Sequence, residues 1–345
     1  MKLDMLFKFP ILQGPMAGGA STPELVAAVS NAGGLGCLAA SLLSPAALRD
    51  QVGQIRRLSD QPFLINLFVL ETPSPSAQDV AQAVELLKPA WQAVGLASLP
   101  TPAQWCQDFA AQFEALLALR PAAASFTFDI LSPAQVERLH DAGILVIGTV
   151  TTVDEALAWE TAGADAVIAS GIEAGGHRGT FLGPQEEATL PAKALWPQVA
   201  QAVRIPVIAA GGIMTGVDIN EALSLGASAV QMGTAFLVTD ESGIHPAYKQ
   251  RLLQAGDTPT RLTRAFSGRY ARGLENRFMQ QMQAVEKQFP AYPVQNALTT
   301  PIRAAAATQG DAEMMSLWAG AEVKRARAMP VAQLMQTLVA EMRTR

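Results

Sequence analysis

Short runs of apolar residues recur along the first 240 residues, and most of them follow a longer stretch with helical spacing of its apolar positions. The runs are too short for helices and almost wholly apolar, which is typical of parallel strands buried on both faces. Eight alternating units favour a closed (β/α)8 TIM barrel, an α/β fold, over an open doubly wound sheet. The predicted strands cover residues 10–14, 35–39, 63–67, 124–128, 145–149, 166–170, 207–211 and 229–232.

The ends of the predicted helices carry signals of their own. Four glycines stand where a helix needs a left-handed residue at its C-terminus: Gly33, Gly143, Gly163 and Gly226. Three pairs combine an N-cap with proline at the first helical position: Thr22-Pro23, Ser44-Pro45 and Ser132-Pro133. Thr152 and Glu155 have the spacing of a capping box.

Two parts of the chain depart from this repeat. More than 50 residues separate the third and fourth strands, which is more than one crossover needs, and the strand pattern stops after residue 240. We therefore expect a barrel domain over residues 1–240 with a helical insertion at about 70–120. A mainly helical C-terminal region, residues 241–345, would pack near the barrel mouth or, alternatively, form a simple outer layer of helices.

Composition and charge narrow the class of protein. The chain is 50% hydrophobic and 16% charged, which suits a globular enzyme, and its net charge of −5 disfavours nucleic-acid binding. Cys37 and Cys106 are too few for a disulfide framework or a structural zinc, so we expect a cytoplasmic protein without a metal site. No signal peptide or membrane span is predicted, and the oligomeric state is open, with a homodimer as one option.

Glycines after the last two predicted strands indicate a phosphate site. "VIAAGGIMTG" (207–216) and "AVQMGTAF" (229–236) each run from a strand through glycine into a helix. Gly211, Gly212 and Gly233 lack side chains that would keep a ligand from the backbone, and we expect free N–H groups at the following helix starts. Loops in this position hold phosphate in many TIM barrels, although tight turns alone would also explain them.

Six motifs, taken together and in order, resemble those of one family. They are "QGPMAGGASTPELVAAVSNAGGLG" (13–36), "INLF" (65–68), "EAGGHRG" (173–179), "AAGGI" (209–213), "QMGT" (231–234) and "SGRYARGLENRF" (267–278). They resemble the nitronate monooxygenases, formerly called 2-nitropropane dioxygenases, of the class I bacterial and fungal type. The resemblance spans most of the chain and implies an FMN-binding TIM barrel with an added helical domain.

The resemblance also implies a reaction and a set of cofactor contacts. Alkyl nitronates such as propionate 3-nitronate would give an electron to FMN, and the flavin semiquinone would reduce O2, so that a carbonyl compound and nitrite form. Asn66 would meet the pyrimidine edge of the flavin, and Ser170 stands where the family often has Gln. The implied FMN contacts are Met16, Ala17, Asn66, Ser170, Gly175, Gly212, Gln231, Met232, Gly233 and Thr234.

His177 lies in the glycine-rich stretch "GIEAGGHRGTF" and matches the catalytic histidine of the family. A protonated imidazole would hold the anionic nitro group, whereas a neutral one could remove the α-proton of a nitroalkane. We expect Gly175, Gly176 and Gly179 to let the loop lie flat along the flavin. A histidine that only satisfies a loop hydrogen bond is the structural alternative. Arg178 could attract an anion or pair with a nearby glutamate.

The remaining candidates favour structural roles. His140 stands near a helix C-terminus and His245 precedes proline, and neither cysteine has a partnered histidine nearby. Five arginines could form an anion-attracting rim or, as is commoner, a solvated face or salt bridges: Arg261, Arg264, Arg269, Arg272 and Arg277.

Three other functions compete with nitronate oxidation. A NAD(P)H-dependent flavin reductase, acting on a quinone or an enoyl-acyl carrier protein, would share the "EAGGH" segment. An inosine monophosphate dehydrogenase type of barrel needs a cysteine after its sixth strand, and this chain has none there. A non-enzymatic phosphate-binding scaffold would be colourless when purified.

Overall fold

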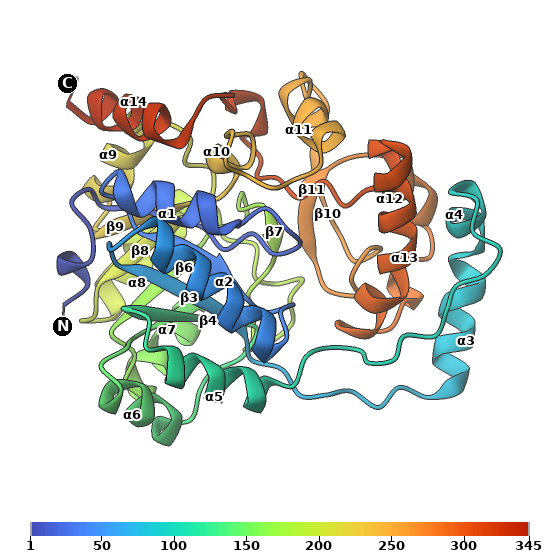
Figure 1. The fold of residues 1–345 in the computed structure, drawn as a ribbon, viewed down its shortest axis with the longest axis horizontal. Helices are drawn as coiled ribbons and strands as arrows, with labels where there is room; N and C mark the ends of the chain where they lie inside the picture. The colour runs from blue at the N-terminus through green and yellow to red at the C-terminus, as the bar shows by residue number, and fades with distance from the viewer. Residues whose placement is uncertain (1, 344–345) are drawn as a thin grey trace.

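Eight parallel strands form the barrel that the apolar runs predict (Figure 1). The computed structural model describes residues 2–343, and the strands follow the order β1-β9-β8-β6-β5-β4-β3-β2 around the sheet. A parallel bridge between Leu12 and Leu35 brings β1 beside β2, so the barrel is nearly closed. The barrel strands are β1 (Ile11–Gln13), β2 (Gly36–Ala39), β3 (Phe63–Phe68), β4 (Ala123–Thr127), β5 (Leu145–Val150), β6 (Ala166–Ser170), β8 (Val207–Ala210) and β9 (Ala229–Met232).

Helices surround these strands. They are α1 (Pro23–Asn31), α2 (Pro45–Leu58), α5 (Phe109–Leu119), α6 (Pro133–Asp141), α7 (Val153–Ala162), α8 (Ala192–Ala202), α9 (Gly216–Ser224), α10 (Thr234–Leu237) and α14 (Val331–Arg343). Of these helices, α1, α2, α6 and α7 begin at the predicted N-caps Thr22, Ser44, Ser132 and Thr152. The four glycines expected at helix ends all have positive φ. Thr152 caps α7, but the predicted capping box does not form. The carboxylate of Glu155 accepts instead from the backbone amides of Thr151, Phe181 and Leu182.

The barrel interior is filled by side chains rather than open. Leu12, Cys37, Leu64, Ile147 and Ile208 are all at most 1% exposed and belong to one inner cluster. The short helix η1 (Leu3–Met5) contributes Leu3 to the same cluster. A packed interior leaves ligand space only at the ends of the strands.

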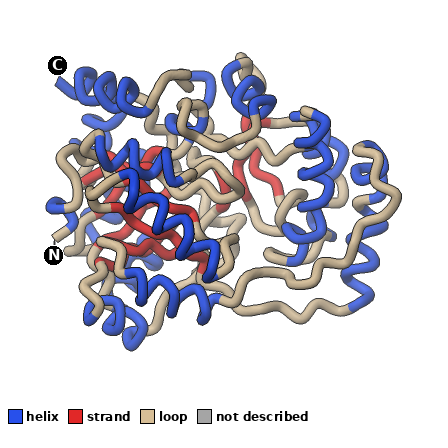
Figure 2. Tube along the Cα trace, in the orientation of Figure 1, coloured by secondary structure: helices blue, strands red, loops and turns tan. Residues whose placement is uncertain are grey.

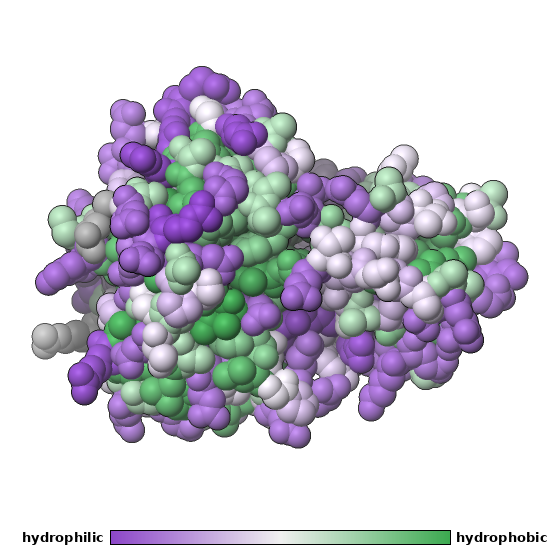
Figure 3. All heavy atoms as spheres, turned by 90° about the horizontal axis from the view of Figure 1, so that it is seen from below, coloured by the Kyte–Doolittle hydropathy of each residue, from purple (hydrophilic) through white to green (hydrophobic). Residues whose placement is uncertain are grey.

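A second hydrophobic cluster joins the helical insertion to the C-terminal region. We call residues 70–108 and 241–330 the cap. Its longer helices lie together on one side of the barrel in Figure 2, and the outline narrows between the two parts in Figure 3. Leu87 and Phe266 are members of this cluster, and both are fully buried. The cap elements are α3 (Ala77–Leu86), α4 (Lys88–Ala93), α11 (Pro246–Leu253), β10 (Thr260–Thr263), β11 (Ala271–Leu274), α12 (Arg277–Met282), η2 (Glu286–Gln288), α13 (Val294–Gln309), η3 (Ala312–Met314) and η4 (Val323–Arg325).

The cap and the barrel are linked by strand pairing that the sequence pattern did not predict. β10 and β11 interrupt the mainly helical C-terminal region, and β11 pairs antiparallel with the two-residue strand β7 (Gly176–His177). At the other end of the cap, α14 returns to the barrel and packs against α1 and α9 (Figure 1). The chain therefore leaves the barrel after β9 and comes back to it in its last helix.

Candidate active site

A cavity of about 660 Å³ opens at the carboxyl ends of the barrel strands, beneath the cap. Every barrel strand, or the loop directly after it, contributes to its wall, as expected for a TIM-barrel site. The eleven residues selected from the sequence all line this cavity: Met16, Ala17, Asn66, Ser170, Gly175, His177, Gly212, Gln231, Met232, Gly233 and Thr234. Its volume lies within the range of about 300–1,000 Å³ that is usual for small-molecule sites.

The glycines after β8 and β9 leave backbone exposed to the cavity. Gly211 and Gly212 have φ of 110° and 75°, which other residues rarely adopt, so glycine is needed for the turn itself. Gly233 has an ordinary φ of −100°, and the atom nearest to an added Cβ would be the Met16 sulfur at 4.0 Å. Gly233 therefore keeps space open rather than relieving strain.

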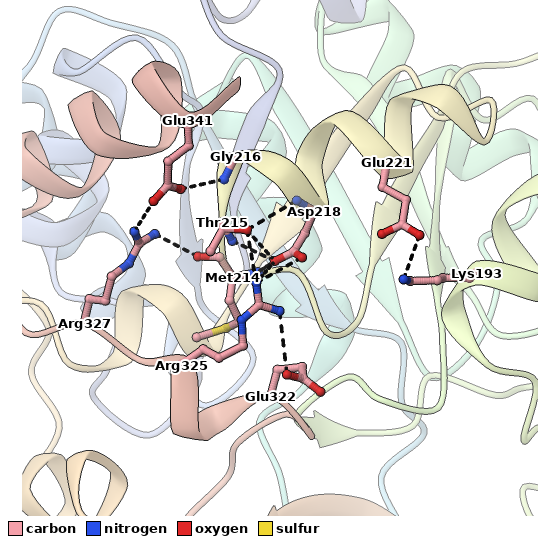
Figure 4. A network of polar contacts seen from close by, with 10 residues as sticks. All are labelled: Lys193, Met214, Thr215, Gly216, Asp218, Glu221, Glu322, Arg325, Arg327 and Glu341. Atoms are coloured by element: carbon pink, nitrogen blue, oxygen red, sulfur yellow. Dashed lines mark hydrogen bonds and ion pairs between the residues drawn. The ribbon is translucent and has the colours of Figure 1, made fainter. Parts of the chain in front are cut away.

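The start of α9 is not free to bind an anion, which corrects the expectation from the sequence. The carboxylate of Asp218 accepts from the amides of Met214 and Thr215, and that of Glu341 accepts from the amide of Gly216 (Figure 4). These acidic side chains satisfy the donors that a helix start leaves unpaired. A phosphate would have to use the turn at Gly211–Gly212 and the start of α10.

Arginines from the end of the cap complete this network. Arg325 pairs with Asp218 at 2.9 Å and with Glu322 at 3.6 Å, and Arg327 pairs with Glu341 at 2.6 Å (Figure 4). The hydrogen bonds from Met214, Arg325 and Thr215 outweigh the effect of burial, which alone would raise the pKa of Asp218, and the net shift is downward. Asp218, Glu322 and Glu341 are thus each paired with an arginine.

Two buried acceptors on the cavity wall have no hydrogen-bond partner in the described chain. They are Oδ1 of Asn66 and Oε1 of Gln231. The amide nitrogen of Asn66 donates to the carbonyl oxygen and hydroxyl of Ser125, at 3.2 and 3.0 Å, so its oxygen remains for a ligand. A buried acceptor without a partner is costly, and a flavin offers N–H and O–H donors to such groups. The cavity therefore fits a flavin nucleotide.

At the opposite end, His177 is surrounded by aromatic rings. Its ring centroid lies 5.4–6.4 Å from those of Phe68, Phe128, Tyr292 and Trp318. The pairing of β7 with β11 fixes the backbone, with Ala271 opposite His177. Aromatic walls exclude water, so electrostatic interactions made there are strong.

The glycines beside His177 allow close contacts with the rest of the chain. A Cβ on Gly175 would lie 2.5 Å from the backbone of Ala319, so this glycine permits close contact with the cap. Gly176 has a φ of 75°, and a Cβ on Gly179 would lie 3.0 Å from the Thr149 methyl. The segment is therefore shaped by its contacts with β5 and with the cap.

His177 is neutral in this environment. Burial, together with the charges of Arg269 and Arg303, lowers its pKa from 6.5 to about 3. Its Nε2 lies 2.9 Å from the Ser267 hydroxyl, which donates to the carbonyl of Arg269 at 3.0 Å. Since that hydroxyl has one proton, it accepts from His177, and the imidazole carries hydrogen on Nε2 and a lone pair on Nδ1.

Five arginines were candidates for an anion-attracting rim. Within the described residues 2–343, none of the five lines the cavity. Arg261 and Arg277 make ion pairs within the cap, and Arg269 lies over the Phe128 ring at 4.1 Å. Arg178 is 1% exposed and donates to the carbonyls of Gly171 and Ala188, so it neither faces a ligand nor forms an ion pair with a described glutamate. These arginines are structural.

Several residues that line the cavity or contact His177 were not selected from the sequence. Phe128 follows β4 with a φ of 85°, and its place at the carboxyl end of a barrel strand could have identified it. Ser267 lies inside the quoted motif "SGRYARG", which carried the resemblance but no assigned role. His245, which was considered structural, caps α11 through Nδ1 and also lines the cavity. Tyr292 and Arg303 come from the cap, where no sequence pattern indicated a site.

Two kinds of feature are absent from the part of the chain that the structure describes. No helix there has the length and apolar character needed to span a membrane. No group of three or more His, Cys, Asp or Glu side chains in residues 2–343 could hold a metal ion.

Comparisons with known proteins agree on one family. The family model described as nitronate monooxygenase matches residues 1–341. Proteins described as probable nitronate monooxygenases from Staphylococcus haemolyticus and Bacillus subtilis are 43% and 42% identical, over 98% and 96% of this chain and 95% of each relative. Among solved structures, a nitroalkane oxidase from Streptomyces ansochromogenes is 43% identical with a TM-score of 0.92, covering 99% of this chain and 97% of its own. FabK from Thermotoga maritima is 31% identical with a TM-score of 0.76, covering 98% and 94%.

Proposed function

The chain belongs to the nitronate monooxygenase family and is a flavin-dependent oxidoreductase, and from this premise we propose that it oxidises alkyl nitronates with FMN and O2. The products would be a carbonyl compound and nitrite. The observation that carries the proposal is one cavity that combines two unpartnered amide oxygens, two glycine turns and a neutral histidine bordered by aromatic rings.

The cofactor would lie across the ends of the strands. The turn at Gly211–Gly212 and the backbone of Gly233 and Thr234 would hold its phosphate, since the first amides of α10 lack acceptors within the helix. Asn66 and Gln231 would accept from the flavin, while Met16, Ala17, Ser170, Gly175 and Met232 would border it. Bound FMN would supply the electron acceptor and the centre that reacts with O2. The cofactor proposed here is FMN rather than a larger flavin nucleotide.

His177 determines which form of the substrate is suitable. An imidazole with a pKa of about 3 is a weak base, so removal of the α-proton from a neutral nitroalkane would be inefficient. The charges of Arg269 and Arg303 instead favour a substrate that is already an anion. When a nitronate binds, its charge offsets those arginines and raises the pKa of His177, so the imidazole can hold a proton toward the nitro oxygens. We therefore propose nitronates, rather than neutral nitroalkanes, as the preferred substrates.

A flavin reductase is the second candidate. The similarity to FabK supports it, but the TM-score of 0.76 is lower than the 0.92 for the nitroalkane oxidase. Rapid flavin bleaching by NADPH without oxygen, combined with no turnover of nitronate in air, would favour the reductase.

Oxygen consumption with propionate 3-nitronate tests the main proposal. The purified protein should be yellow, release FMN on denaturation, consume O2 with the nitronate and form nitrite. A colourless protein, or a yellow one that leaves the nitronate untouched, would contradict it. A homodimer and a cytoplasmic location remain proposals that rest on the sequence alone.

A further inference from the structure

A buried carboxylate on the barrel helix α7 lies behind the segment that carries His177. Glu155 is 0% exposed, and no other Asp or Glu of residues 2–343 is buried to this degree. It does not line the cavity. A buried charge is costly unless hydrogen bonds and opposite charges compensate for it, so the partners of Glu155 show what it stabilises.

The carboxylate of Glu155 ties the backbone just beyond the histidine to the barrel. Its Oε1 accepts from the amides of Phe181 and Leu182, at 2.5 and 3.0 Å. Its Oε2 accepts from the amide and the hydroxyl of Thr151, at 2.6 and 2.9 Å. Because the single proton of that hydroxyl goes to Glu155, the hydroxyl accepts from Thr180 at 2.8 Å. Three consecutive loop residues therefore depend on one carboxylate.

Glu155 also offsets two buried arginines. Burial lowers the pKa of Arg178 and of Arg269 to about 10, and the charge of Glu155 is the largest attraction that opposes this shift in both. The guanidinium of Arg269 donates to the carbonyls of Arg178 and Thr180. After burial itself, the charge of Arg269 is the largest cause of the low pKa of His177. Glu155 thus limits the net positive charge beside the imidazole.

His177 is held from two sides. On the cap side, its Nε2–H donates to Ser267, whose hydroxyl donates to the carbonyl of Arg269. On the barrel side, Glu155 anchors the backbone that follows the histidine. Arg269 belongs to both sets of contacts, because its carbonyl binds Ser267 and its guanidinium binds the anchored segment. Displacement of that segment would therefore displace the imidazole.

We propose that Glu155 is a positioning residue, whose carboxylate anchors residues 180–182 and offsets the charge of Arg269 so that His177 stays in place and can hold a proton toward the substrate. This inference rests on the proposed function and adds to it a residue that contacts neither substrate nor cofactor. Without the carboxylate, the two arginines leave a positive charge that opposes a proton on the imidazole but attracts an anion. The loss should therefore appear in kcat and not as a higher KM.

Matched glutamate substitutions test this role. E155Q keeps the shape of the side chain but removes its charge and one acceptor. E160Q is the control, because Glu160 lies on the same helix and also accepts from two loop amides, those of Arg204 and Ile205 at the amino end of β8. On propionate 3-nitronate, E155Q should retain its flavin and lose ~30-fold in kcat without a rise in KM, while E160Q stays within ~2-fold of the wild type.

A milder substitution tests the same role if E155Q does not fold. T151V removes the hydroxyl that joins Glu155 to Thr180 but leaves the carboxylate and its amide donors. Its kcat should fall about fivefold, as expected for the loss of one hydrogen-bonded link. T161V removes an exposed hydroxyl from the same helix and should match the wild type.

The imidazole provides a readout that does not depend on turnover. The chain has three histidines, so 15N-histidine labelling gives three sets of ring signals, and the set missing from H177N belongs to His177. E155Q and T151V should shift the ring signals of His177, because its hydrogen bond to Ser267 changes, while those of His140 and His245 stay at wild-type positions.

Three outcomes would overturn the inference. These are wild-type ring signals of His177 in the folded variants, a loss that appears only as a higher KM, and an equal loss of kcat in E155Q and E160Q. If the wild type leaves the nitronate untouched, the proposed function fails, whereas the ring signals still test whether Glu155 positions His177.

Discussion

The two ends of the cavity differ in how their charged groups are paired. At the glycine end, Asp218 and Glu341 hold the start of α9, and each is paired with an arginine from residues 325–327. At the histidine end, Arg303 has only uncharged partners and His177 is kept neutral. The ion pairs hold the start of α9 in place. The amide oxygens of Asn66 and Gln231 have no partner in the described chain and are available to a ligand. Sequence alone does not separate these cases, because the ion pair of Asp218 with Arg325 joins residues that are 107 positions apart.

The largest effect should come from filling the glycine end. Gly233→Leu has an allowed φ and room for its Cβ, so the chain should fold normally while the side chain occupies ligand space. We expect the variant to lose nearly all of its flavin and with it its activity. Absorbance at ~450 nm per mole of protein measures this. Gly53→Leu on the outer helix α2 is the control, and full flavin retention in G233L would show that the phosphate lies elsewhere.

The next effect concerns the histidine end. His177→Asn should keep its flavin but lose at least ~100-fold in kcat on nitronates, within the range of a positioned proton-handling group. Because the pKa of His177 is about 3 in the free enzyme, kcat/KM of the wild type on a nitronate should show no histidine ionisation between about pH 5 and 8. His140→Asn at the opposite end of the barrel is the control. An inflection near pH 6.5 that disappears in H177N would contradict the neutral imidazole.

A change at the paired end should affect stability rather than chemistry. Asp218→Ala should lower the free energy of unfolding by about 1–3 kcal/mol, since two amides and Arg325 lose their acceptor. The lowered pKa of Asp218 means that its stabilisation is complete above the ordinary pKa of about 4 and is lost as pH falls through the folded value. Denaturant unfolding at pH 7 and at pH 3 should therefore show a smaller difference between D218A and wild type in acid. Unfolding equal to wild type at pH 7 would mean that the network is not stabilising.

The smallest effect should come from the hydrogen bond behind the histidine. Ser267→Ala removes the acceptor for Nε2–H, so kcat should fall about fivefold, as expected for one net hydrogen bond. KM should change little, because Ser267 does not line the cavity. Ser267→Thr keeps the hydroxyl and should recover most of the rate. Equal losses in both variants would assign Ser267 a packing role instead.

The barrel could be predicted because its pattern is local. Each strand of the barrel is a short apolar run after a helix, and N-caps such as Thr22 and Ser44 are read from adjacent residues. The cavity wall from Met16 to Thr234 followed from motifs at the ends of those strands. In this part of the molecule, the residues that form each strand and the residues that line the cavity are close together in the sequence.

The other half of the site depends on contacts between distant segments. Nothing in the residues around Arg303 shows that α13 faces His177, and β11 was read as part of a helical tail. The amide of Gly216 seemed free because its acceptor, Glu341, lies 125 residues away, whereas the capping box of Thr215 and Asp218 at the same helix start could have been read from the sequence. The division of the chain at residue 240 remains a proposal, and the contacts of α14 with α1 and α9 favour counting that helix with the barrel.

The pairing of β7 with β11 has a consequence for how substrate preference could change among related enzymes. The backbone of His177 pairs with the cap strand β11, and its ring contacts Tyr292 and Trp318 of the cap. Sequence changes confined to the cap would therefore alter the surroundings of the imidazole while leaving the barrel residues proposed to border the flavin unchanged.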